Sequence, residues 1–147
     1  MSAMDLGAVL EIENRAYVAP WTRGNFVDAL AAQNIAEVLV DPSADLIGYF
    51  VAMVGVDELH LLNLTVSPAW QGQGLGRELL DAVGAHGRQR QLGTLWLEVR
   101  ESNQRARAMY ERLGFVEIHR RRSYYPAGEK REDAVVMSLA LSPQEVP

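Results

Sequence analysis

The spacing of apolar residues predicts two helices at the start of the chain. Apolar side chains recur at helical spacing over residues 6–17, and Ser2 with Asp5 forms the sequence pattern of a capping box. Thr22 is a suitable N-cap for a second helix, whose apolar stripe continues to about residue 31. A helical pair therefore precedes any strand.

The middle of the chain changes to the pattern of strands. Residues 36–40 and 46–54 are β-branched or apolar runs, and the five residues between them have the composition of a turn, so they predict an antiparallel hairpin. Residues 59–66 carry leucine on both faces, which is typical of a strand in the interior of a covered sheet. Three strands thus follow the two helices.

The rest of the chain alternates between the two patterns. The predicted elements are a helix over 75–89, a strand over 94–100, a helix that ends at Gly114, and a final hairpin of strands 115–124 and 134–141 that turns around Pro126 and Gly128. This succession predicts an α/β fold with a mixed, three-layer sheet. With no repeat or linker, residues 1–147 are expected to form one domain.

Composition narrows the class of protein. The 147 residues are 48% hydrophobic and 22% charged, which suits one globular domain. The absence of cysteine excludes disulfides, thiolate metal sites and a covalent thioester on the protein, and the three histidines have no ligand spacing, so no metal is expected. The longest uncharged apolar stretch, residues 46–56, is shorter than the roughly 20 residues of a membrane span. The N-terminus has no signal-peptide pattern, so a cytoplasmic protein is expected.

Charge is distributed unevenly along the chain. Residues 1–99 carry 12 acids and 5 bases, whereas residues 100–131 carry 9 bases and 4 acids. Two interpretations of the basic segment stay open: it could bind a phosphorylated ligand, or its charged side chains could simply be solvated at the surface. A direct nucleic-acid partner is not expected, because the pI is about 5.2 and strand alternation separates the side chains of Arg120, Arg121 and Arg122.

A glycine-rich segment between a strand and a helix is the most informative motif. Residues 71–77 read Gln-Gly-Gln-Gly-Leu-Gly-Arg, and alternate glycines at a helix N-terminus expose backbone N–H groups that bind phosphate oxygens. The dinucleotide fingerprint fails, because Arg77 or Leu79 stands where its last glycine is needed, and no Walker Gly-Lys-Ser/Thr follows. The residues alone leave two interpretations open, an anion cradle or a plain connecting turn.

The spacing Gln71-x-x-Gly74-x-Gly76 resembles the pyrophosphate loop of the GNAT acetyltransferase superfamily. Further segments resemble its bacterial RimI type, the ribosomal-protein-alanine N-acetyltransferases: Pro20-Trp21, residues 95–100, Ser102-Asn103, residues 109–115, Tyr124-Tyr125-Pro126 and residues 131–134. The resemblance covers about residues 5–141 and implies a GNAT-type α/β/α fold with a mixed, mainly antiparallel central sheet. Such enzymes usually begin with a strand, so we expect that first edge strand to be missing here or encoded upstream.

The resemblance also implies an activity. Such an enzyme moves the acetyl group of acetyl-CoA to an N-terminal alanine of a ribosomal protein by direct attack in a ternary complex. Two alternatives stay open: acetylation of lysine or small-molecule amines, which a deeper and more negative pocket would favour, and a noncatalytic acyl-CoA-binding module. The pair Glu98 and Tyr110 argues against a pure binder, because binding alone needs neither a proton acceptor nor a proton donor.

Two residues are the candidate acid–base groups. The resemblance makes Glu98 the acceptor of the amine proton; a strand carboxylate paired with Arg100 or facing solvent is the alternative. It makes Tyr110 the donor to the departing thiolate, although its place on an apolar helical stripe is also typical of a core aromatic.

The remaining candidates bind ligands. For acetyl-CoA the resemblance implies the backbone of Leu64, Thr65 and Val66 beside pantetheine and thioester, the loop Gln71, Gly72, Gln73, Gly74, Leu75, Gly76 and Arg77 around the pyrophosphate, and Asn103, which is also a plausible N-cap. It places Tyr124 and Tyr125 in the peptide groove, where packing of the last hairpin is the alternative. Acidic residues including Asp57, Glu58, Glu132 and Asp133 are expected near the groove, where they would attract a basic tail.

Overall fold

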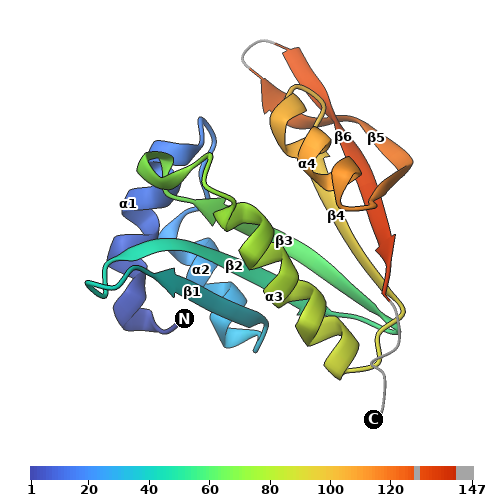
Figure 1. The fold of residues 1–147 in the computed structure, drawn as a ribbon. Coiled ribbons are helices and arrows are strands. Elements are labelled where there is room, and N and C mark those ends of the chain that lie inside the picture. The colour runs from blue at the N-terminus through green and yellow to red at the C-terminus, as the bar shows by residue number, and fades with distance from the viewer. Residues whose placement is uncertain (128–129, 142–147) are drawn as a thin grey trace. The chain divides into compact units, whose positions relative to one another are not determined.

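The computed structural model describes residues 1–127 and 130–141, and Figure 1 shows its helices and strands. In chain order the elements are η1 (Ala3–Asp5), α1 (Leu6–Ala16), α2 (Arg23–Ala31), β1 (Ile35–Val40), β2 (Leu46–Val54), β3 (Glu58–Val66), η2 (Pro68–Trp70), α3 (Leu75–Gln89), β4 (Thr94–Arg100), α4 (Gln104–Arg112), β5 (Val116–Ala127) and β6 (Lys130–Ala140). The six strands form an open, mixed and mostly antiparallel sheet in the order β1-β2-β3-β4-β6-β5. The predicted fold class is confirmed.

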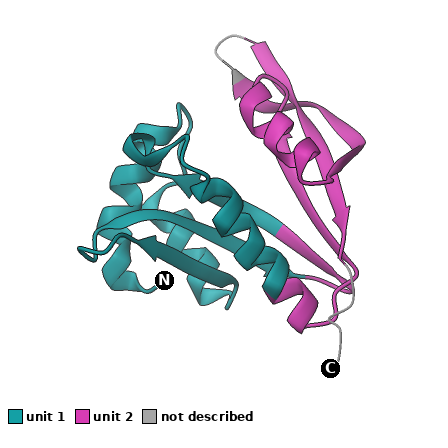
Figure 2. Cartoon of the chain, viewed as in Figure 1, with its two compact units in different colours: residues 1–54, 61–85 teal, residues 55–60, 86–147 magenta. Residues whose placement is uncertain are grey.

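The chain divides into two compact units, coloured separately in Figure 2. The first unit comprises residues 1–54 and 61–85, and the second comprises residues 55–60 and 86–147. The division runs through β3 and α3, so the two units share elements. The expectation of a single domain stays a prediction.

In the first unit, the capping box of Ser2 and Asp5 lies around the short helix η1, which leads directly into α1, and Thr22 caps α2 as predicted. The backbone N–H of Ser2 donates to Asp5 Oδ2 at 2.7 Å, and the N–H of Asn25 donates to Thr22 Oγ1 at 3.2 Å. Both helices then bury one apolar face against β2. The core that they form with this strand consists of Leu6, Val9, Ile12, Phe26, Ala29, Tyr49 and Val51.

Strand β2 is buried on both faces over residues 47–52. Its Tyr49 and Val51 belong to the core with α1 and α2, whereas a Cβ built on the neighbouring Gly48 would lie 3.2 Å from Leu79 Cδ1 of α3. The helices therefore cover opposite faces of these strands, as Figure 1 shows. Strand β1 pairs with β2 in antiparallel register, which confirms the first predicted hairpin.

In the second unit, β6 pairs antiparallel with both β4 and β5. Residues Leu95, Leu97 and Val99 of β4 are buried and the residues between them are half-buried, so the predicted alternation of this strand is confirmed. Helix α4 begins directly after its N-cap Asn103, whose side chain accepts from the N–H of Ala106 at 3.3 Å, and it ends before Gly114, which has a φ of +100°. Both predicted helix ends are therefore correct.

The last hairpin extends further than the apolar pattern predicts. Strand β5 continues past Tyr124 to Ala127, and β6 begins at Lys130 rather than Ala134. Pro126 pairs with Arg131 inside the hairpin, so its assignment to the turn was wrong, whereas Gly128 lies outside the described residues. Proline is tolerated here because β5 is an edge strand, where its missing N–H breaks no ladder hydrogen bond.

Strand β5 contains extra residues relative to its partner. Between the pairs Arg121–Ala134 and Tyr125–Glu132 it has two more residues than β6, and Ser123 within this bulge has a φ of +52°. The bulge is held by β6, because the N–H of Ser123 donates to Asp133 Oδ1 at 2.9 Å and Arg131 Nε donates to the Ser123 carbonyl at 2.7 Å. The simple alternation expected for this segment is therefore interrupted.

No helix in the described part of the chain is both long and apolar enough to cross a membrane.

Two glycine-to-alanine substitutions should have opposite effects on stability. At Gly114, alanine would have to adopt a φ of +100° with its Cβ 3.2 Å from Leu139 Cδ1, so unfolding free energy should fall by about 1 kcal/mol or more. At Gly7 in α1 no atom lies within 4 Å of a built Cβ, so alanine should stabilise the protein by roughly 0.5–1 kcal/mol. Urea unfolding of both variants measures these changes, and equal effects would contradict the assigned C-terminal cap.

Candidate functional site

The glycine loop has the local geometry of an anion site. Gly72 and Gly74 have φ values of +83° and +80°, a conformation that side-chain-bearing residues seldom adopt. Residues 71–74 are exposed, and α3 starts directly afterwards at Leu75, with the first helical hydrogen bond from the N–H of Glu78 to the carbonyl of Gly74. The N–H groups of the preceding residues have no partner inside the helix, so they can bind an anion.

This geometry fits the pyrophosphate of acetyl-CoA. A Cβ built on Gly74 meets no protein atom within 4 Å, so the space above its backbone is open. Leu75, Gly76 and Arg77 are the first residues of α3, and the side chain of Arg77 is exposed at the positive end of the helix dipole. The loop residues Gln71 to Arg77 all belong to the first unit, and their contact with the pyrophosphate stays a prediction.

The carbonyls of the predicted pantetheine segment are contacted by side chains of the first unit. The hydroxyl of Tyr17 donates to the Leu64 carbonyl at 3.1 Å, and Gln71 Nε2 donates to the Val66 carbonyl at 3.1 Å. Thr65 lies between them with a buried side chain. Gln71 therefore connects the loop to the end of β3, a contact that its sequence position alone does not reveal.

Glu98 lies in the second unit among aromatic and cationic groups. Its carboxylate Oε1 is 3.5 Å from Arg121 Nη2 and 4.0 Å from His60 Nε2, and its side chain is only 10% exposed. The expected alternative partner, Arg100, instead pairs with Glu132 at 2.9 Å. A sheltered carboxylate on a strand is suitable as a proton acceptor.

His60 is held beside Glu98 by a stacked tryptophan. Its ring lies 3.5 Å from that of Trp96 with an angle of 9° between the planes. Burial, assisted by the positive charge of Arg121, lowers the pKa of His60 from 6.5 to about 4. The imidazole is therefore neutral at pH 7, and its contact with Glu98 is not an ion pair.

Tyr110 and Asn103 both belong to α4 of the second unit. Tyr110 is 8% exposed and its ring packs on Phe115 at 5.5 Å, as a core aromatic does. The Asn103 side chain caps the helix through Ala106, yet the residue is exposed. The structure thus establishes the packing and capping interpretations, and the catalytic and coenzyme-binding roles of these residues stay predictions.

The two tyrosines of β5 pack against each other and under arginines. Their rings are 5.0 Å apart, Arg100 lies 4.4 Å from the centre of the Tyr125 ring, and Arg121 lies 5.3 Å from that of Tyr124. Burial, followed by the negative charge of Glu98, raises the pKa of Tyr125 to about 12. Tyr124 is 43% exposed and faces solvent, whereas Tyr125 is half-buried and packs against the Tyr124 ring.

Acidic residues of the second unit are matched by arginines. Glu132 accepts from Arg100 and from the N–H of Ser102, and these bonds lower its pKa. The N–H of Ser123, followed by Arg122, lowers the pKa of Asp133 in the same way. Because these carboxylates and Glu98 already have cationic partners, they offer less free negative charge to a basic tail than their sequence positions suggest.

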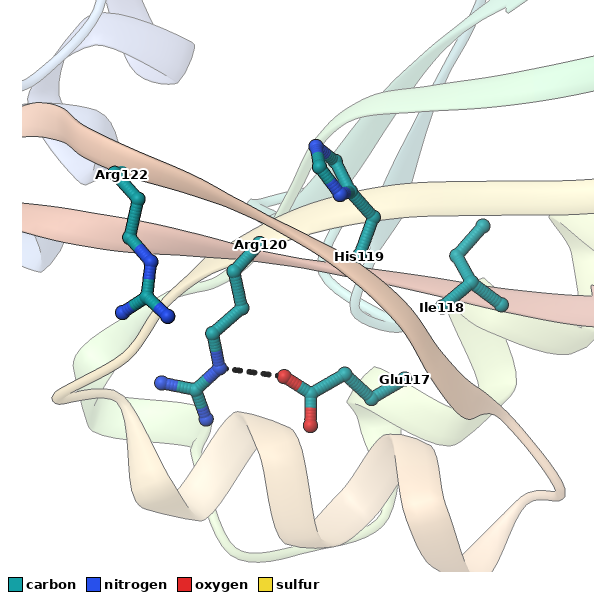
Figure 3. A pocket seen from close by; sticks show the side chains of 5 residues that line it. All are labelled: Glu117, Ile118, His119, Arg120 and Arg122. Atoms are coloured by element: carbon teal, nitrogen blue, oxygen red, sulfur yellow. Dashed lines mark hydrogen bonds and ion pairs between the residues drawn. The ribbon is translucent and has the colours of Figure 1, made fainter.

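A shallow pocket on β5 contains none of the predicted site residues. It is lined by Glu117, Ile118, His119, Arg120 and Arg122. Figure 3 shows the side chains of Arg120 and Arg122 on one side of the strand and that of His119 on the other. Arg120 pairs with Glu117 and Glu101, and Arg122 pairs with Asp133, so this surface is a set of ion pairs rather than an open basic patch.

Comparison with known proteins agrees with this geometry. The sequence model of the Acetyltransferase (GNAT) family matches residues 6–115. The chain belongs to the GNAT acetyltransferase family. GNAT enzymes use acetyl-CoA, which is the ligand that the open glycine loop fits. In the described residues no group of three or more His, Asp or Glu side chains is arranged to hold a metal ion.

Relatives within the GNAT family match almost the whole chain. The [ribosomal protein bS18]-alanine N-acetyltransferase of Escherichia coli strain K12 is 39% identical over 142 residues, which is 97% of this chain and 95% of the relative. The protein of the same name from Haemophilus ducreyi is 36% identical over 93% of this chain and 94% of its own length. The crystal structure of the ribosomal-protein-S18-alanine N-acetyltransferase from Escherichia coli matches with a TM-score of 0.90, covering 99% of this chain and 93% of that chain.

Sequence reasoning missed several residues that lie near predicted site residues within one or the other unit of this GNAT protein. His60 and Trp96 lie on half-buried strand faces, where nothing in sequence marks two rings that will stack. The buried Glu13 was visible as a carboxylate on the apolar stripe of α1, four residues after Val9. Asn63 continues the buried face that Leu59 and Leu61 begin, a signal that the leucines of the opposite face obscured.

The lowered pKa of His60 gives a measurable dependence on pH. Between about pH 4 and 6.5 the unfolded chain binds a proton at His60 that the folded protein does not, so this contribution to stability is present above pH 6.5 and lost as the pH falls toward 4. An NMR titration should place the His60 ring near pH 4, and His60→Gln should reduce the loss of stability over that interval. His119→Gln, which removes an exposed histidine, is the control. A His60 titration near pH 6.5 would contradict this environment.

Proposed function

We propose that this GNAT protein acetylates the N-terminal alanine of a ribosomal protein, using acetyl-CoA as donor. The observation that carries the proposal is the near full-length identity, 39% and 36%, to proteins named as bS18-alanine N-acetyltransferases. The open backbone at Gly74 and the sheltered carboxylate of Glu98 support it. Acetyl-CoA and ribosomal proteins meet in the cytoplasm, which is therefore the proposed location.

The coenzyme brings an acetyl group activated as a thioester, and the chain supplies binding groups. We assign the pyrophosphate to the N–H groups of residues 71–77, where backbone donors and the positive end of the α3 dipole act together. Leu64, Thr65 and Val66 would pair with pantetheine and direct a backbone donor at the carbonyl oxygen of the thioester. Asn103 adds a polar contact while it caps α4.

Glu98 would take the proton from the attacking amine. A peptide α-ammonium has a pKa near 8, compared with about 10.4 for lysine, so an α-amine needs less help from a base at neutral pH. Glu98 is sheltered from solvent, as a general base can be. The positive charge of its neighbour Arg121 repels a second cation, such as a protonated lysine, from the same carboxylate. These features favour an N-terminal acceptor over lysine.

Tyr110 would donate its proton to the departing thiolate. The side chain of Tyr110 is nearly buried, and its ring packs against Phe115. A free phenol has a pKa near 10 and a free thiol one near 8.5, so proton transfer from a phenol to a thiolate is slightly uphill and depends on a positioned donor. Tyr124 and Tyr125 are the proposed contacts for the peptide, with the exposed ring of Tyr124 available to it.

The acceptor can be tested with peptides and with ribosomal proteins. A peptide that begins with alanine should be acetylated faster than a peptide whose N-terminus is blocked and whose only amine is an internal lysine. Mass spectrometry of ribosomal proteins from cells with and without this chain should show loss of an N-terminal acetyl group in its absence. Faster acetylation of the blocked lysine peptide at several pH values would refute the N-terminal assignment and favour a lysine or small-molecule acetyltransferase. Acetyl-CoA binding without any turnover would favour a noncatalytic module.

Removing the acid–base groups should separate catalysis from binding. Glu98→Gln and Tyr110→Phe should each lower kcat by roughly 10²-fold or more, as expected for general acid–base groups, while the affinity for acetyl-CoA changes little. Turnover by Glu98→Gln should partly recover as the pH rises, because free amine then becomes available without a base. Glu101→Gln, which removes a carboxylate that pairs only with Arg120 in the described structure, is the matched control. Normal turnover in both variants would contradict the assigned roles.

A further inference from the structure

A buried carboxylate that the proposed chemistry does not use lies at the centre of the first unit. Glu13 of α1 is 1% exposed. Its Oε1 accepts from the hydroxyl of Tyr49 at 2.6 Å and from Asn63 Nδ2 at 3.1 Å, and its Oε2 accepts from the N–H of Trp21 at 2.9 Å. The three donors are neutral and come from β2, β3 and the segment between α1 and α2. A carboxylate only accepts, so every one of these hydrogens must point toward Glu13.

The carboxylate fixes the direction of the next hydrogen bonds. The amide nitrogen of Asn63 is committed to Glu13, so its oxygen accepts, and it does so from Thr65 Oγ1 at 2.7 Å. The single hydroxyl hydrogen of Thr65 is then used, which leaves only lone pairs on its oxygen. Tyr17, whose hydroxyl oxygen lies 2.8 Å from Thr65 Oγ1, must therefore be the donor of that pair.

Tyr17 ends this series at the surface. Its hydroxyl hydrogen points inward, shared between Thr65 Oγ1 and the Leu64 carbonyl. Burial raises the pKa of Tyr17, so the phenol keeps this hydrogen throughout the neutral range. The residue is nevertheless 38% exposed, and the remaining lone pair of its oxygen is an acceptor with a fixed position. A neutral acceptor of this kind is suited to an N–H donor.

We propose that Tyr17 is a ligand-binding residue, whose hydroxyl oxygen accepts a hydrogen bond from an N–H of a bound substrate. The inference rests on the proposed function, because that function places the thioester and pantetheine at Leu64 and Thr65, the residues that Tyr17 contacts. Under that function, two donors of this chemistry would reach the segment: the amino terminus of the acceptor peptide and an amide N–H of pantetheine. Glu13 is a positioning residue, which acts on the substrate only through the Asn63, Thr65 and Tyr17 side chains.

Tyr17→Phe tests the hydrogen bond with little change in shape. One net hydrogen bond corresponds to a roughly 3- to 10-fold change in an equilibrium. We expect the KM for an alanine-initiated peptide to rise by that factor with kcat changed less than twofold. A fall in acetyl-CoA affinity by calorimetry instead would identify the pantetheine amide as the donor. Unchanged KM and unchanged acetyl-CoA affinity in the folded variant would overturn the proposal.

Val18→Ala is the matched control, because Val18 adjoins Tyr17 and is fully exposed. It should leave KM, kcat and acetyl-CoA affinity unchanged. If Tyr17 had only a structural role, Tyr17→Phe would lower the Tm without a selective change in the KM for the peptide or in the affinity for acetyl-CoA. The Tm of both variants is therefore measured alongside the kinetics. If the wild-type chain does not acetylate the peptide at all, the proposed function fails, whereas the calorimetric comparison still tests the pantetheine arm of this inference.

Glu13→Gln tests whether the network acts through Tyr17. The amide places an NH₂ group where three donors already point, so the directions of the hydrogen bonds must change. We expect Glu13→Gln to change the same quantity as Tyr17→Phe, either the KM for the peptide or the affinity for acetyl-CoA. The double variant should show no larger change in that quantity than the more impaired single variant, because the two residues act through one network. Additive effects would refute the positioning role of Glu13. If Glu13→Gln does not fold, the Tyr17→Phe comparison still decides the proposal.

Discussion

The buried carboxylate of Glu13 constrains the whole first unit. A carboxylate out of water is very costly unless donors surround it, and here the donors come from three separate segments of the chain. Helix α1 cannot shift along β2 and β3 without leaving a donor or the carboxylate unpaired. The same bonds fix the segment that carries Pro20 and Trp21, and they set the position of the β3 backbone that the proposed reaction uses. One polar residue in an apolar stripe thus defines the register between a helix and a sheet.

The second unit is organised by arginine–carboxylate pairs rather than by one buried group. Arg100 joins β4 to the last hairpin through Glu132 and the Pro126 carbonyl, while Asp133 holds the bulge at Ser123. Single exposed ion pairs contribute little, but these pairs share partners with backbone N–H groups and with the tyrosine rings. Their combined effect is on the position of the backbone. They define where the extra residues of β5 leave the ladder, and therefore where Tyr124 and Tyr125 lie.

The environment of Glu98 shows how a common fold acquires a particular site. Membership of the GNAT family accounts for the sheet, the glycine loop and the use of acetyl-CoA. The ring of His60 stacked on Trp96, and the guanidinium of Arg121 near the same carboxylate, are details of this chain that a family assignment does not supply. The neutral imidazole of His60 and the permanent cation of Arg121, both near Oε1 of Glu98, influence which charges can approach this carboxylate.

The sequence by itself determined the elements of the fold, their order and most of their ends. Periodicity located the helices and strands, and local signals such as Thr22, Asn103 and Gly114 marked helix ends, because capping depends only on residues within one turn. The glycine loop was equally readable, since glycine adopts positive φ values without steric cost. The ends of β5 and β6 were not, because Lys130 to Asp133 are charged and a hairpin of ion pairs has no apolar pattern.

Only the tertiary structure decided which side chains meet. Glu13 and Asn63 are 50 residues apart in the sequence, and His60 and Arg121 are also distant in sequence from Glu98, so no local pattern specifies these contacts. The carboxylate of Glu13 sets the direction of each hydrogen bond in the series that leads to Tyr17. This set of directions therefore exists only when all the side chains of the series are in place in the folded protein. Arg100 pairs with Glu132 rather than with Glu98 for the same reason: strand register, not proximity in sequence, selects the partner.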